Sequence, residues 1–127
     1  MNVLFEDGGV LRAAALLSEQ AGAIQVEFPG GKREKVRADR VLLHFAKPLP
    51  LELLTDGQKL ATEVDREFLW EVAGDAEFAF SDLAREYFGH PPTAIESAAM
   101  LTVLYGSPSH FSRRGVGRFQ AVTMEAR

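Results

Sequence analysis

Three arginines lie close together near the C-terminal end of the sequence, at Arg113, Arg114 and Arg118. Glycines at positions 115 and 117 lie between them, in the order typical of a tight turn between two short strands. The planar arginine guanidinium donates two parallel hydrogen bonds, so it suits the phosphate groups of nucleic acids. His110 opens the same segment and is a further candidate contact. The segment predicts a basic hairpin that binds phosphates; the alternative is a hairpin tip that is exposed only for solubility.

A second, weaker basic strip lies in the first third of the chain, at Lys32, Arg33 and Lys35, and continues to Arg37 and Arg40. It follows a Pro-Gly-Gly turn. A phosphate-binding P-loop is excluded, because Gln25 stands where the first glycine is needed and Arg33 where a Ser or Thr is needed. The strip predicts either a further nucleic-acid contact or an ordinary charged surface.

No set of residues predicts catalysis or metal binding by this chain. The sequence has no cysteine, and its three histidines are far apart. Glu63, Glu67 and Glu71 recur every four residues, which indicates the solvated face of a helix. No Gly-x-Ser-x-Gly nucleophile motif occurs. We therefore expect no catalytic residue, no metal ligand and no cofactor here.

The net charge of −4 over 127 residues conceals a strong segregation. Residues 49–106 carry three basic and eleven acidic side chains, whereas residues 107–127 carry four basic and one acidic. Residues 1–48 are nearly balanced, with seven basic and six acidic side chains. Such a chain can touch nucleic acid locally, because charges interact over about a Debye length of ~8–10 Å. No membrane-spanning run or secretory signal is recognisable, so a cytoplasmic location without membrane contact is expected.

Residues 1–48 have the pattern of five short strands separated by tight turns. Ile24, Val26 and Phe28 alternate with polar residues, as in a strand with one buried face. The strands are expected at residues 2–6, 10–19, 23–28, 32–37 and 41–45. We expect a small SH3-like β-barrel, whose closure would remove the exposed edge strands.

Residues 49–127 are expected to form a helical helix-turn-helix domain with a C-terminal β-hairpin wing, so the fold class is α+β. Helices are expected at residues 51–64, 66–72, 82–88 and 94–105. Ser81 and Thr93 are the expected N-caps of the last two helices, and Glu96 completes a capping box with Thr93. Gly89 and the following prolines form the corner between them. Trp70 is expected in the core.

The helix expected at residues 94–105 contains no Lys, Arg, Asn or Gln. Recognition helices read base edges in DNA with these side chains. The helix is apolar nearly all round, so we expect it to be buried.

The order of these segments resembles the N-terminal region of ribonuclease II-like (RNB family) exoribonucleases, in the bacterial variety with a helix-turn-helix region before the catalytic domain. The resemblance covers essentially the whole chain. Its most characteristic parts are FLWE at 68–71, GD at 74–75, EF at 77–78, DLA at 82–84, YFG at 87–89 and GRF at 117–119. None of these is a catalytic motif.

The resemblance implies a fragment that guides single-stranded RNA into a 3′–5′ exoribonuclease. Its Mg²⁺ and catalytic aspartates would belong to a larger domain that has no counterpart in this sequence. Two alternatives stay open, a winged-helix DNA-binding regulator and an SH3-like protein-interaction adaptor. The RNA preferred and the oligomeric state do not follow from the sequence.

Overall fold

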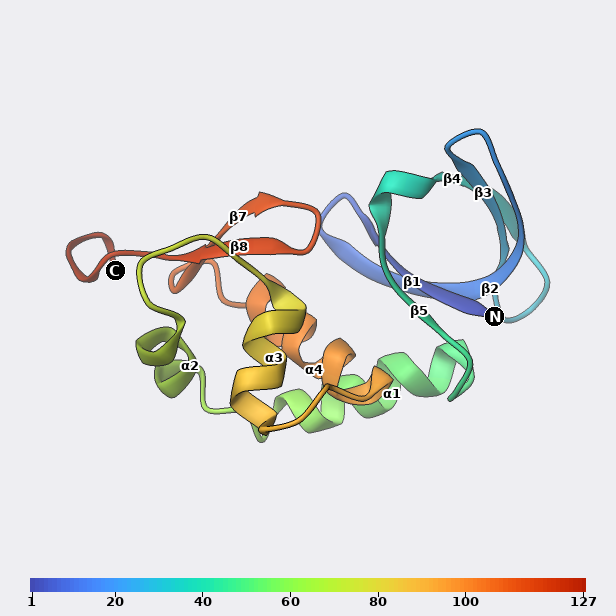
Figure 1. Cartoon of the computed structure of the whole chain (residues 1–127). Helices are drawn as coiled ribbons and strands as arrows, with labels where there is room; N and C mark the ends of the chain where they lie inside the picture. The colour runs from blue at the N-terminus through green and yellow to red at the C-terminus, as the bar shows by residue number, and fades with distance from the viewer.

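The first part of the chain is a curled antiparallel sheet of five strands, as the computed structural model of residues 1–127 shows (Figure 1). The strands are β1 (Asn2–Asp7), β2 (Val10–Gln20), β3 (Ala23–Glu27), β4 (Arg33–Arg37) and β5 (Val41–Phe45). Their order in the sheet is β4-β3-β2-β1-β5. The pairing register shifts within β1 and again within β2. Such irregularities bend strands, which explains the curl.

The sheet is not closed, and this corrects the expected barrel closure. β4 and β5 are its two edges, and no ladder joins them. The chain leaves β4 through a short 3-10 helix, η1 (Ala38–Arg40), and β5 then pairs with β1 at the opposite edge. Three of the five side chains of β4 are cationic and exposed. Exposed charges of this kind protect an edge strand from pairing with another copy of itself.

Four helices follow: α1 (Pro50–Ala61), α2 (Arg66–Ala73), α3 (Phe80–Phe88) and α4 (Ala94–Tyr105). The predicted capping box of α4 is confirmed, with the Glu96 amide donating to the Thr93 hydroxyl at 3.1 Å and the Thr93 amide donating to the Glu96 carboxylate at 2.9 Å. Asp65 caps α2 by accepting from the Phe68 amide at 3.1 Å. Gly89 ends α3 in the left-handed conformation, at φ 79°.

The predicted start of α3 is wrong. Ser81 lies inside the helix and caps nothing, because Phe78–Ala79 form a short strand, β6, that leads directly into Phe80. The Phe80 amide donates to the Gly117 carbonyl at 2.9 Å, so the start of the helix is held by the hairpin. The hairpin strands are β7 (Phe111–Gly115) and β8 (Arg118–Ala121), and the second sheet has the order β6-β8-β7.

Two hydrophobic cores hold the chain together. The smaller lies inside the curl of the first sheet and includes Val3, Phe5 and Ile24. The larger crosses the expected boundary near residue 48, because Leu4 of the sheet belongs to the same cluster as Leu101 of α4. α1 packs along α4, and both sheets lie against the helices (Figure 1). The two parts therefore share the larger core.

Trp70, which was expected in the core, packs against it but is not fully buried. Its ring is half-buried, and the fully buried neighbour on α2 is Leu69. The Trp70 indole N–H donates to the Val122 carbonyl at 2.7 Å, and the Arg127 guanidinium lies 4.5 Å from the ring. The side chain thus fastens the C-terminal segment to α2. None of the helices combines the length and apolarity that crossing a membrane requires.

Candidate nucleic-acid interface

The wing, formed by β6, β7 and β8, has two different faces. Phe111 and Phe119 lie on its inner face and are buried in the larger core. Side chains alternate along a strand, so Ser112 and its cross-strand partner Gln120 point outward. Arg114 is the extra residue of a bulge, and its Nε donates to the Gln120 side-chain oxygen at 3.0 Å. The outer wing face consists of Ser112, Arg114, Arg118 and Gln120.

The two arginines of the outer wing face keep much of their capacity to bind an anion. Arg114 is exposed and forms no ion pair. Arg118 donates to the Glu77 carboxylate, and both side chains of that pair are nearly half exposed, at 49% and 42%. Exposed ion pairs contribute only about 0–1 kcal/mol, so a phosphate can compete for Arg118.

Arg113 is half-exposed, with 51% of its side chain accessible, but its guanidinium is paired with a buried carboxylate. Its Nη1 donates to Glu6 Oε1 at 2.6 Å, and its guanidinium lies 5.6 Å from the Tyr105 ring. The Glu6 side chain is only 8% exposed. Taking Arg113 away from it would leave a buried carboxylate without its cation. Burial, together with Glu6, raises the pKa of the Tyr105 hydroxyl, which donates to Glu6 Oε2 at 2.9 Å.

His110 is buried, with 7% of its side chain exposed. Its Nε2 lies 2.6 Å from Glu67 Oε1, and its Nδ1 lies 2.9 Å from the Ser109 hydroxyl. The hydrogen bond with His110, followed by that from Arg127, lowers the pKa of Glu67. His110 thus links the start of β7 to α2, and little of its ring faces solvent.

The second basic strip lies on the other sheet. Lys32 Nζ is 4.0 Å from Glu34, and Arg33 donates to Glu27 at 3.0 Å. Lys35 is exposed and forms no ion pair. No hydrogen bond or ion pair joins these residues to the wing arginines. The structure therefore separates the predicted site residues: Lys32, Arg33 and Lys35 lie on or just before β4, away from those of the wing.

The predicted burial of α4 is confirmed along most of its length. Ala98, Ala99, Met100, Leu101 and Leu104 are each at most 2% exposed. α1 covers one side of α4 closely enough that a Cβ built at Gly57 would lie 2.8 Å from the Ala98 methyl group. The helix therefore presents no Lys, Arg, Asn or Gln side chain to base edges.

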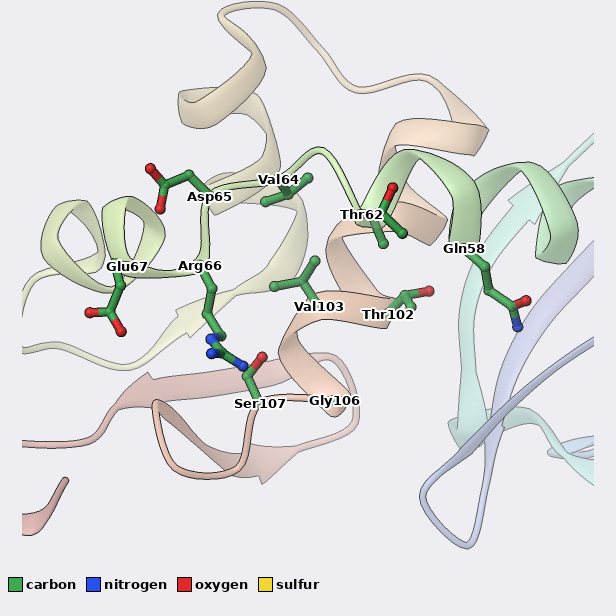
Figure 2. Close-up of a pocket in the computed structure, with 11 residues that line it drawn as sticks. Gln58, Thr62, Val64, Asp65, Arg66, Glu67, Thr102, Val103, Gly106 and Ser107 are labelled. Atoms are coloured by element: carbon green, nitrogen blue, oxygen red, sulfur yellow. The ribbon is translucent and has the colours of Figure 1, made fainter.

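A hollow of about 560 Å³ lies where α1 and α2 meet the C-terminal end of α4 (Figure 2). Arg66 points across it toward Ser107, and Asp65 and Glu67 stand beside it. Sequence reasoning did not identify this hollow, because its walls come from three separate segments with no common motif. The adjacent carboxylates oppose binding of a phosphate there.

No group of three or more His, Cys, Asp or Glu side chains is placed to hold a metal ion. The Mg²⁺ implied by the resemblance would bind in a separate catalytic domain, so this finding does not bear on it. Compared with family models, with curated proteins and with solved structures, the chain shows no match.

Proposed function

We propose that this chain is a non-catalytic RNA-guiding module, the N-terminal portion of a ribonuclease II-like exoribonuclease. In this proposal the outer wing face contacts the phosphates of single-stranded RNA. The observation that supports it most is the pairing state of the arginines: Arg114 has no carboxylate partner, and Arg118 has only a half-exposed one. Ser112 and Gln120 add polar side chains on the same face.

The fold description that goes with this function is a winged helix beside an open, SH3-like curled sheet. β6 lies between α2 and α3 in sequence and pairs with the last strand, β8. A strand in that position, two helices joined by a tight corner and a closing hairpin are the parts of a winged helix-turn-helix. The unanticipated strand β6 therefore favours the winged-helix description.

Contact through phosphates fits the structure better than the reading of a DNA sequence. The helix that would enter a major groove, α4, is largely buried and contains no Lys, Arg, Asn or Gln. Phosphate contacts are indifferent to sequence and need only exposed cations. The acidic helices oppose close approach elsewhere, so we expect the isolated chain to bind RNA weakly.

Two tests address the proposal. Titration of labelled single-stranded oligo-RNA and of duplex DNA, followed by fluorescence anisotropy, is expected to show weak RNA binding without sequence preference. Tight binding to one duplex DNA site would instead support a regulator. The gene's reading frame tests the parent enzyme, since a catalytic ribonuclease domain is expected after Arg127, and a stop codon there would contradict it.

A further inference from the structure

The free edge of the first sheet, strand β4, carries unpaired backbone groups in a defined order. β3 and β4 are antiparallel, with Gln25 opposite Lys35. The Phe28 amide donates to the Lys32 carbonyl at 2.8 Å, and the Ala38 amide to the Gly22 carbonyl at 2.9 Å. In an antiparallel pair, directly hydrogen-bonded positions alternate with positions whose groups point away.

The alternation determines which groups are free. Even-numbered residues of β4 bond to β3, so the amides of Arg33, Lys35 and Arg37 face the open edge. The carbonyls of Arg33 and Lys35 face it as well. No other strand pairs with this edge. The edge therefore offers amide donors and carbonyl acceptors at every second residue, which is the pattern that another peptide strand complements.

The side chains of the same three residues add a charge preference. Arg33, Lys35 and Arg37 are all exposed, and they lie on one face of β4 because side chains alternate along a strand. Lys35 forms no ion pair, and the pairs of Arg33 and Arg37 are with exposed or half-exposed carboxylates. A strand added here would place every second side chain directly beside one of these cations.

There is room beside the edge. A hollow of about 240 Å³ runs between residues 34–37 and the turn that joins β1 to β2. Its other walls include Phe5, Arg12 and Arg40. The two carboxylates that β1 contributes to this hollow already have partners, since Glu6 binds Arg113 and Asp7 binds Arg12 at 3.0 Å. Arg40 forms no ion pair and adds a further cation.

We propose that the β4 edge binds an extended acidic peptide segment of a partner protein, which adds to the sheet as a sixth strand. The segment carries Asp or Glu at every second position, opposite Arg33, Lys35 and Arg37, with small residues between them that face the hollow. A second copy of this chain is a poor occupant, because β4 against β4 would set cations against cations. RNA supplies the negative charge but not the alternating backbone donors and acceptors. The proposal concerns a different sheet from the wing and does not depend on RNA binding.

The test is amide hydrogen exchange of the whole chain, followed by NMR. In the free protein the amides of Arg33, Lys35 and Arg37 should exchange rapidly, while those of Glu34 and Val36 are protected. A synthetic peptide that alternates Asp with Val should slow the three rapid amides. The same peptide with N-methylated backbone amides, and a peptide that alternates Lys with Val, should not.

Variants separate the contribution of charge from that of the backbone. Lys35→Ala should weaken binding of the acidic peptide roughly two- to fivefold, the range for one cross-strand charge pair. Lys35→Pro, which removes the central free amide, should weaken it at least roughly tenfold. Lys59→Ala on α1, also an exposed lysine without an ion pair, should leave binding unchanged. Continued protection of the Glu34 amide shows that each variant keeps its sheet.

The proposal is overturned if the acidic peptide leaves the three amides unprotected, or if the N-methylated or Lys peptide protects them equally. Protection of these amides by oligo-RNA but not by the acidic peptide would also overturn the proposal, and would indicate that the β4 edge binds phosphates. Equal affinity of Lys35→Pro and wild type would show that the peptide binds elsewhere.

Discussion

Arg113 Nη1 donates to Glu6 Oε1 at 2.6 Å and so joins β7 to β1 across 107 positions of sequence. Tyr105 donates to the other oxygen of the same carboxylate at 2.9 Å. The adjacent turn is close as well, since a Cβ built at Gly9 would lie 3.4 Å from Arg113 Nη1. An arginine expected to hold phosphate thus holds the wing against the first sheet.

Arg113→Ala should lower the free energy of unfolding by about 1–3 kcal/mol, the range for losing a hydrogen bond to a charged, buried group. The matched control is Arg114→Ala, next to it in sequence but on the outer wing face, which should change stability by no more than about 0.5 kcal/mol. Urea unfolding measures both. Equal losses in the two variants would show that the Glu6–Arg113 pair is not structural.

Gly57→Ala should destabilise the fold by about 1–3 kcal/mol, although alanine is the better helix former. The added methyl group would meet Ala98 at 2.8 Å and force α1 away from α4. Thr55→Ala, at an exposed position of the same helix, is the control and should be neutral or slightly stabilising. A thermal melt of Gly57→Ala at or above the wild-type midpoint would contradict this packing.

Leu69→Ala should cost about 2–5 kcal/mol, because Leu69 is fully buried. Trp70→Phe keeps most of the ring and loses the hydrogen bond to Val122, so it should cost only about 0.5–1.5 kcal/mol. Chemical unfolding distinguishes the two variants. A larger loss of stability in Trp70→Phe than in Leu69→Ala would show that Trp70 is the more important core residue.

Acid should destabilise the fold through Glu67 and Glu96. Hydrogen bonds from His110 and Arg127 lower the pKa of Glu67. Burial opposes ionisation of Glu96, but the Thr93 amide and His90 outweigh it and lower its pKa as well. Both carboxyls bind a proton more weakly when folded than when unfolded. Their stabilisation is therefore complete above the ordinary glutamate pKa of 4.5 and is lost as the pH falls below it.

Glu96→Gln tests this dependence, because glutamine can still complete the capping box. The fall in melting temperature between about pH 5 and pH 3 should be shallower in Glu96→Gln than in wild type. Glu63→Gln, an exposed glutamate without a side-chain hydrogen bond, should follow the wild-type curve. The same dependence of melting temperature on pH in all three proteins would show that Glu96 does not contribute to acid sensitivity.

Most elements could be predicted from local sequence because local chemistry determines them. The glycine turns, the Asp65 cap and the Thr93–Glu96 capping box each depend on residues within a few positions of one another. Strand β6 could not be predicted, since two residues are too few for alternation to show. The sequence also could not predict that the sheet is open, because this depends on how far apart the two edge strands, β4 and β5, lie in space.

The site was less predictable than the fold, because the availability of a cation depends on distant partners. Nothing near Arg113 in sequence indicates that Glu6 holds it. The burial of His110 against Glu67, 43 positions away, is equally invisible locally. Arg114 and Arg118 lie on the other face of the wing from Arg113, which their neighbours in sequence do not indicate.

Salt-dependent RNA binding by a wing double variant tests the central claim most directly. Arg114→Ala/Arg118→Ala and wild type are titrated with single-stranded oligo-RNA at several salt concentrations, with thermal melts to confirm folding. Lys59→Ala/Arg85→Ala removes the same charge from exposed residues of the acidic helices and is the control. The wing variant should bind more weakly and flatten the slope of log K against log salt by roughly 1.4, about 0.7 per lost phosphate contact. The control should keep the wild-type slope. Equal affinity and slope for the wing variant and wild type would contradict an RNA contact on the outer wing face.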